Sequence, residues 1–73
     1  IVKIEKLKDH KNLYIEGKRT EQIITMTNIN NQEGLERIYY HFEKTGIQKA
    51  LNKVNAEIGD FVIIKGKKIP YRN

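Results

Sequence analysis

Few side chains in this sequence have the chemistry of an enzyme active site. The chain contains no cysteine and no serine, and neither His10 nor His41 has a partner at metal-ligand spacing. His10 falls in a turn pattern and His41 on the flank of a helix, so a structural role is the simpler interpretation of both. A nucleotide-binding loop is also missing, because Gly66-Lys67 lacks the upstream glycine and the following hydroxyl that cradle phosphates. We therefore expect no catalytic residue, no metal site and no cofactor in this chain.

A first candidate set for recognition is Arg37, Tyr40 and Lys44. Helical spacing projects these side chains away from the apolar stripe of the same segment, where they could stack a base of RNA and hold its phosphate. The alternative is a solvated helix face on which Glu33 and Arg37 form an ion pair at i, i+4, which stabilises a helix only slightly. We favour the solvated face and keep these residues as candidate RNA contacts.

A second candidate is the densest basic cluster, which consists of Lys65, Lys67, Lys68 and Arg72. Residues 59–73 carry four basic side chains and one acidic one, whereas residues 28–58 are neutral overall. Such a cluster attracts RNA phosphates. Charge also protects an exposed sheet edge from pairing with another strand, so the sequence leaves both roles open.

A third candidate surface follows from alternation in the most apolar stretch, FVII. Alternation does not say which pair faces inward; the facing implied by a family resemblance described below places Val62 and Ile64 toward the core. Alternation then turns Phe61 and Ile63 to the other face of the sheet, where Tyr14 of an earlier strand joins them. One-sided sheets usually place polar residues there. An apolar outer patch predicts contact with the rest of a parent protein, a partner or a second copy, unless the termini cover it.

The composition indicates one small domain, residues 1–73. The net charge is +5, which attracts nucleic acid, although abundant Ile, Lys and Asn also follow from an A/T-rich genome. No apolar run approaches the roughly 20 residues of a membrane span, and no signal peptide opens the chain. Together with the lack of cysteine, this predicts a soluble, cytoplasmic protein with no membrane partner. Because the first residue is Ile1 and not Met, we expect an excised part of a longer protein.

The pattern of elements predicts an α+β fold. Val2 and Ile4 alternate with polar residues, as do Leu13 and Ile15, so the first two segments are typical of an antiparallel hairpin. Pro70 places the last segment at a strand end or a sheet edge. The expected order is β-β-α-α-α-β-β, over residues 1–7, 12–17, 18–26, 29–46, 47–56, 61–64 and 67–71. Strands at both ends with helices between them predict a mainly antiparallel sheet of about four strands with about three helices on one face.

The clearest helix is the one expected within residues 29–46. Its apolar residues recur at i, i+3, i+4 and i+7, and they are Leu35, Ile38, Tyr39 and Phe42. Asn30 or Asn31 can cap its start, and with Asn30 as the cap Glu33 would complete a capping box. Gly46 can take the left-handed conformation that closes a helix. Everything else must pack on this apolar stripe.

Residues 14–64 resemble the C-terminal domain of the Obg family of bacterial GTPases. The resemblance rests on order and spacing over about 50 residues, and the matching positions are Gly17, Glu21, Met26-Thr27, Asn31, Glu33, Gly46-Ile47, Ala50-Leu51, Ala56, Gly59-Asp60, Val62 and Ile64. The chain departs from the family pattern at Thr20, Gln22, Asn28 and Gly34, where relatives often carry Ile, Arg, Asp and Ala. Many relatives are also acidic in this region.

The resemblance implies that a glycine-rich domain and a GTP-binding domain, with GTP and Mg²⁺, precede this chain in a longer protein. It further implies association with the large ribosomal subunit, through rRNA or protein, and a part in ribosome assembly and in growth or stress control. On this basis we expect a non-catalytic regulatory or interaction domain that contacts its own GTPase domain or ribosomal components. The alternative is a free-standing small RNA-binding domain.

Overall fold

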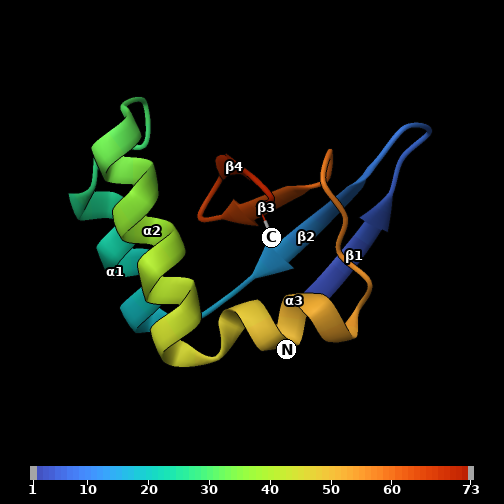
Figure 1. The fold of residues 1–73 in the computed structure, drawn as a ribbon, viewed down its shortest axis with the longest axis horizontal. Coiled ribbons are helices and arrows are strands. Elements are labelled where there is room, and N and C mark those ends of the chain that lie inside the picture. The colour runs from blue at the N-terminus through green and yellow to red at the C-terminus, as the bar shows by residue number, and fades with distance from the viewer. Residues whose placement is uncertain (1, 73) are drawn as a thin grey trace.

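The computed structural model describes residues 2–72 and places three helices against one face of a four-stranded sheet (Figure 1). The elements are β1 (Val2–Lys6), β2 (Lys11–Ile15), α1 (Lys18–Met26), α2 (Gln32–Thr45), α3 (Ile47–Lys53), β3 (Phe61–Ile64) and β4 (Lys67–Pro70). Their order and the α+β class confirm the prediction. Ile1, at the start of the first expected strand, and Asn73 lie outside the described residues. Within the described part, no helix has the length and hydropathy needed to cross a membrane.

The four strands lie side by side in the order of the sequence, β1-β2-β3-β4. β1 pairs with β2 and β3 with β4 in antiparallel fashion, whereas the central pair, β2 with β3, is parallel. The three helices form the connection from β2 to β3, because a parallel neighbour requires a long crossover. The sheet is therefore mainly antiparallel, as expected, with a parallel pair at its centre.

The hairpin between β3 and β4 has a two-residue turn, since Ile64 pairs with Lys67. Both turn residues, Lys65 and Gly66, have positive φ angles, of 50° and 78°. Positive φ at both central positions is the property of the type I′ turn, whose twist matches that of the two strands. The bend expected at Gly66 is confirmed, and it presents three lysines close together in the chain.

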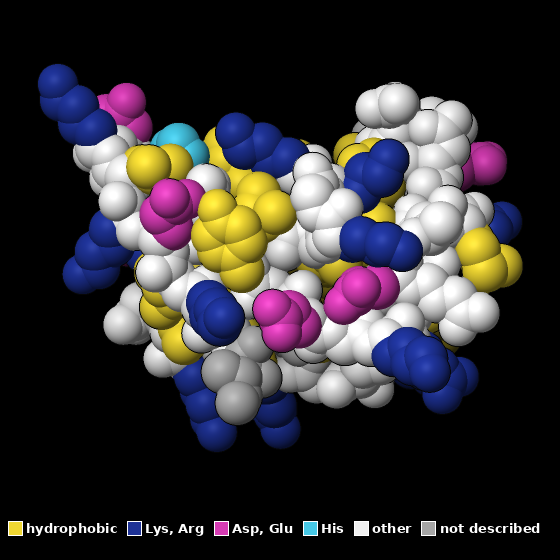
Figure 2. Space-filling view, turned by 180° about the vertical axis from the view of Figure 1, so that it is seen from behind, with side chains coloured by type: hydrophobic (Ala, Val, Ile, Leu, Met, Phe, Trp, Pro, Cys, Tyr) yellow, Lys and Arg dark blue, Asp and Glu magenta, His cyan; other side chains and the backbone are white. Residues whose placement is uncertain are grey.

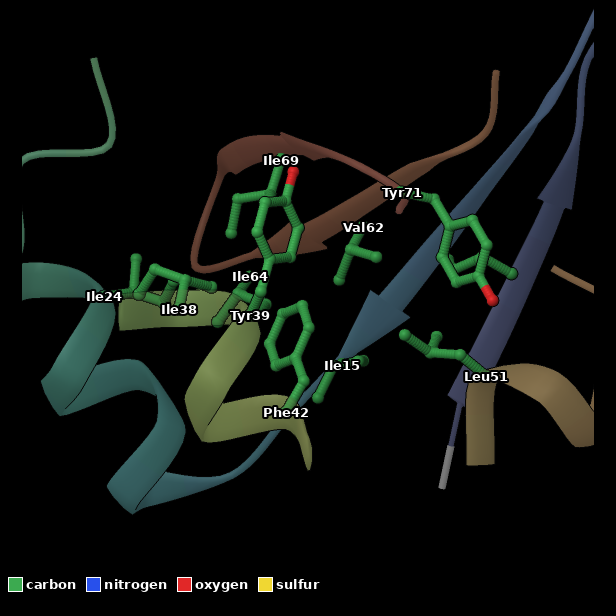
Figure 3. Packing of buried hydrophobic residues seen from close by; sticks show 11 residues of the cluster. Ile15, Ile24, Ile38, Tyr39, Phe42, Leu51, Val62, Ile64, Ile69 and Tyr71 are labelled. Atoms are coloured by element: carbon green, nitrogen blue, oxygen red, sulfur yellow. The ribbon is translucent and has the colours of Figure 1, made fainter. Parts of the chain in front are cut away.

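The core lies between the helices and the inner face of the sheet (Figure 3). Alternate strand residues such as Leu13, Val62, Ile64 and Ile69 are fully buried, which confirms the predicted facing of β2 and β3. The other buried apolar residues are Ile15, Ile24, Ile38, Tyr39, Phe42, Leu51 and Tyr71. In Figure 3, Ile24 and Ile38 lie at one end of the cluster and Leu51 and Tyr71 at the other, so a single core joins all three helices to the sheet.

Helix α2 begins and ends with locally encoded caps. The structure selects Asn31 as the N-cap, and its side chain accepts a hydrogen bond of 2.8 Å from the Gly34 amide. The capping box with Asn30 is therefore not formed. Gly46 closes the helix with a φ of 82°, as predicted. A side chain at Gly34 would clash with the backbone, because a Cβ there would lie 1.7 Å from the Asn28 carbonyl oxygen.

Two details of the prediction are wrong. The third helix ends at Lys53 and not at residue 56, because Asn55 takes a left-handed conformation and the Ala56 amide donates to the Leu51 carbonyl. This pattern is a Schellman motif, in which asparagine replaces the usual glycine. Ile4 was expected on a half-buried side but is 43% exposed. It lies on β1, an edge strand with a neighbour on one side only.

Candidate functional site

The outer face of the sheet carries the predicted apolar patch, which we call the sheet patch: Tyr14, Phe61 and Ile63. Pairing of Tyr14 with Ile63 across β2 and β3 places them on the face opposite the buried Leu13 and Val62. All three patch residues are half-buried. Seen from behind in Figure 2, hydrophobic side chains gather on the surface among basic and acidic ones. Alternation, together with the facing implied by the family resemblance, therefore predicted which residues lie on this face.

Phe61 is enclosed by its polar neighbours. The Lys68 ammonium lies 4.6 Å from the centre of the Phe61 ring, a cation–π contact, and the His10 ring meets it edge-on at 5.2 Å between centroids. The structure thus brings two predicted site residues, Phe61 and Lys68, into contact. Because the ammonium covers the ring, Phe61 is poorly placed to stack a nucleic acid base.

Tyr14 is held by a small network on the same face. Its hydroxyl donates to the Glu5 carboxylate at 2.8 Å, and the Asn12 amide donates to the same oxygen at 3.1 Å. The hydrogen bond from Tyr14, followed by that from Asn12, lowers the pKa of Glu5, and the same carboxylate raises the pKa of Tyr14. The network fixes the tyrosine ring beside Ile63, so this part of the patch is preorganised.

The basic cluster divides into two parts. Lys65, Lys67 and Lys68, which we call the lysine turn, are exposed, and within residues 2–72 none of them forms an ion pair with a carboxylate. Arg72 instead binds Glu36 of α2 in a bidentate ion pair, and its guanidinium stacks 4.2 Å from the Tyr39 ring centre. Arg72 therefore attaches the C-terminal segment to a helix, whereas the lysine turn has no carboxylate partner among the described residues.

The helix face holds the remaining candidates. Tyr40 is 60% exposed, and the Lys44 ammonium lies 5.5 Å from its ring centre. Arg37 lies one turn away and borders a small hollow of about 160 Å³ at the start of α2. Among the described residues it forms no ion pair with Glu33, so the expected i, i+4 pair is absent. The face is solvated, and the Lys44 ammonium lies over one side of its tyrosine ring.

The most buried charge, Asp60, was expected as part of a turn and as one position of the family resemblance, with no contact assigned to its side chain. Its side chain is almost fully buried, and it accepts hydrogen bonds from the Lys11 and Glu57 amides and an ion pair from the Lys11 ammonium, all at 2.9 Å. Burial alone would raise the pKa of Asp60, but the Lys11 ammonium and the two amides outweigh it, and the pKa is lowered. The Asp60 carbonyl also accepts a hydrogen bond from the Tyr71 amide. Asp60 therefore links the start of β2, the start of β3 and the residue that follows β4. The family resemblance includes Asp60, but the local sequence does not show that its side chain is buried against Lys11.

The histidines have structural neighbours. His10 packs on Phe61, and His41 Nε2 lies 3.1 Å from the buried Thr20 hydroxyl between α1 and α2. Burial, and secondly the charge of Arg19, lower the pKa of His41. Over residues 2–72, no three His, Asp or Glu side chains come close enough together to hold a metal ion. His41 thus has a hydrogen-bonding partner, whereas His10 has a ring contact while its Nε2 is buried without a hydrogen bond.

Comparisons with known proteins agree with the resemblance seen in the sequence. Residues 2–71 match the family described as "Domain of unknown function (DUF1967)". Similar proteins named GTPase Obg occur in Elusimicrobium minutum (31% identical over 71 residues, 97% of this chain), Lactobacillus delbrueckii (36% over 61 residues, 84%) and Syntrophomonas wolfei (39% over 51 residues, 70%). No solved structure was found to match the chain.

The chain spans only a small part of these relatives, namely 15%, 14% and 12% of their respective lengths. Their catalytic GTPase domain is therefore not the part to which it corresponds. The family match covers almost every described residue, and the chain accordingly belongs to the DUF1967 family, the C-terminal domain of Obg GTPases.

Proposed function

We propose that this chain is a single C-terminal domain, residues 1–73, of a longer Obg-type GTPase, and that it acts by contact and not by catalysis. The observation that carries the proposal is the family match over residues 2–71. GTP and Mg²⁺ would be bound by a domain that precedes this one, because this sequence holds no nucleotide-binding loop. We also propose that the protein acts in the cytoplasm.

Two surfaces support an interaction role. The sheet patch leaves apolar side chains half-exposed on a face that the three helices do not cover. The lysine turn beside it presents three exposed cations. We propose that the sheet patch contacts the protein's own GTPase domain and that the lysine turn contacts rRNA or an acidic protein of the large ribosomal subunit. Such contacts would couple the domain to ribosome assembly and to growth or stress control.

A free-standing RNA-binding domain that uses Arg37, Tyr40 and Lys44 has weaker support. Base stacking needs an open aromatic ring, and the Lys44 ammonium already lies over the Tyr40 ring. Arg37 lies one turn before Tyr40 and borders the hollow at the start of α2. The helix face therefore lacks the arrangement that would make it the main contact surface.

The cheapest test reads the gene upstream of the codon for Ile1. The proposal requires a GTP-binding motif there, and its absence would exclude an Obg-type parent. The contact role is then tested in the full-length product, with Lys65, Lys67 and Lys68 changed together to glutamine. Loss of three phosphate contacts should reduce the slope of log affinity for large ribosomal subunits against log salt by about 2.

The matched control replaces Lys18, Lys49 and Lys53 with glutamine, which removes the same charge from the helices at exposed positions outside both candidate surfaces. Equal losses in both variants would show that net charge matters and not the lysine turn. An unchanged slope in the lysine-turn variant would remove that surface from the proposal, while the presence of the upstream motif would still support the family assignment.

A further inference from the structure

A cavity of about 320 Å³ lies where five elements meet, at the end of the sheet nearest the helix α2–α3 junction. Its volume is in the range of small-molecule sites. Every element except β3 and β4 contributes to it, and its lining residues are Val2, Ile15, Glu16, Arg19, Thr20, His41, Thr45, Ile47 and Ala50. Neither the family resemblance nor the surfaces described above use this cavity.

The lining of the cavity has two chemically different parts. Val2, Ile15, Ile47 and Ala50 are aliphatic, come from β1, β2 and α3, and supply an apolar wall. The polar part includes one anion and one cation, Glu16 and Arg19, which lie three residues apart. An apolar wall beside opposite charges suits a ligand that has an aliphatic group and both signs of charge.

The two charged side chains are available. Glu16 and Arg19 are exposed, and within residues 2–72 neither forms an ion pair with the other or with another side chain. The Thr20 hydroxyl is already engaged by His41 Nε2 at 3.1 Å. Burial, followed by the nearby Arg19 guanidinium, lowers the pKa of His41, so the imidazole is neutral at pH 7 and adds no second cation. The charge at the cavity is therefore one carboxylate and one guanidinium.

We propose that this cavity binds a small aliphatic zwitterion, with the chemistry of a free aliphatic α-amino acid. The ligand carboxylate pairs with Arg19, its ammonium pairs with Glu16, and its side chain packs against Ile15 and Ile47. Charge-assisted hydrogen bonds to both ends supply specificity, and burial of the aliphatic group supplies affinity. This inference is independent of the proposed contacts with a GTPase domain or a ribosome.

The proposal is tested with the 73-residue chain and three compounds of similar size. The probe is L-leucine, compared with 4-methylpentanoate, which lacks the ammonium, and isoamylamine, which lacks the carboxylate. Binding is followed by the NMR shifts of the Val2, Ile15 and Ile47 methyl groups. We expect leucine to shift these methyls and to bind about tenfold more tightly than either analogue, because each analogue loses one charged pair.

Variants assign the two charges. Arg19→Gln should weaken leucine and 4-methylpentanoate but leave isoamylamine unchanged, whereas Glu16→Gln should weaken leucine and isoamylamine but leave 4-methylpentanoate unchanged. Both side chains are exposed, so neither change threatens the fold. Arg37→Gln, an exposed position of α2 that does not line the cavity, is the matched control and should change nothing.

Three results would overturn the proposal. The first is no shift of the cavity methyls by leucine at tens of millimolar. The second is equal binding of all three compounds, which would show that only the aliphatic group is recognised. The third is equal loss of leucine binding in Arg19→Gln and in the Arg37→Gln control, which would reduce the effect to net charge.

Discussion

The two faces of strand β3 have opposite surroundings, although they are built from adjacent residues of similar type. Val62 and Ile64 are completely buried beneath the helices, whereas Phe61 and Ile63 lie half-buried on the face that the helices leave open. All four side chains are apolar, so hydrophobicity alone does not separate them. The covered face stabilises the fold, and the uncovered face leaves apolar surface partly exposed to solvent.

The polar contacts of the two faces differ in the same way. On the covered side they join distant parts of the chain, as when Tyr39 donates to the Pro70 carbonyl at 2.6 Å and Tyr71 donates to Asn52 at 2.7 Å. On the open side they join close neighbours in the sheet, as in the contact of Tyr14 with Glu5. The polar contacts of the covered side therefore form only when helices and sheet are assembled. Those of the open side form within the sheet alone.

The largest expected effect is a direct test of this difference, with Ile64→Ala compared with its neighbour Ile63→Ala. Ile64→Ala should lower the free energy of unfolding by about 3 kcal/mol, because it leaves a cavity in the core. Ile63→Ala should cost about 1 kcal/mol, because its side chain is already half in water. Both changes replace isoleucine with alanine in β3, so the loss of β-strand propensity is the same and cancels when the two free energies are compared. Urea unfolding curves measure both values.

Equal losses in the two isoleucine variants would mean that the open face is covered in solution, and a second copy of the chain would then be the first candidate. Measuring the molecular mass of the wild type by light scattering, over a range of concentrations, separates that case. If the chain is a monomer and Ile63→Ala costs as much stability as Ile64→Ala, the proposed difference between the two faces is wrong.

The next largest effect concerns the charge buried at the border of the covered side. Asp60→Asn should lower the free energy of unfolding by about 2 kcal/mol, because the Lys11 ammonium loses its buried partner and the side chain keeps only part of its acceptor capacity. Thermal or urea unfolding at pH 7 measures this loss. Glu5→Gln, which alters the exposed network of the open face, is the control and should have a much smaller effect.

The difference in stability between the wild type and Asp60→Asn should also depend on pH. Because the folded-state pKa of Asp60 is lowered, its contribution to stability is fully present above the unfolded pKa of about 4 and disappears as the pH falls through the folded value. The stability difference between wild type and Asp60→Asn should therefore shrink on acidification below about pH 4. A difference that stays constant down to pH 2 would show that the carboxylate charge is not the source of the stabilisation.

The last of these tests concerns the tight turn between α1 and α2. Alanine normally favours a helix over glycine, but Gly34→Ala should lower the free energy of unfolding by about 2 kcal/mol, because the new Cβ would lie 1.7 Å from the Asn28 carbonyl oxygen and the backbone of the turn must shift. Chemical denaturation measures the change. A stabilised Gly34→Ala variant would show that the turn moves at no cost.

Much of the fold was predictable because its signals are local. Alternation in β2 and β3, the apolar stripe of α2 and the closing glycine Gly46 each predicted a structure that the coordinates confirm. The same local reasoning was wrong at the end of α3, where Asn55 takes the left-handed conformation that glycine usually adopts. It also grouped Arg72 with the lysines, since charge spacing cannot reveal that Glu36 lies beside the end of the chain.

The sequence by itself therefore determined the element order, the α+β class and which residues of each central strand share a face, because helix and strand periods are properties of neighbouring residues. Only the tertiary structure decided that β2 and β3 are parallel neighbours, that Asp60 is buried against Lys11, and that a cavity opens at the meeting of five elements. Each of these features joins residues far apart in the chain. Their energies depend on the distance between groups in space, which no local pattern in the sequence specifies.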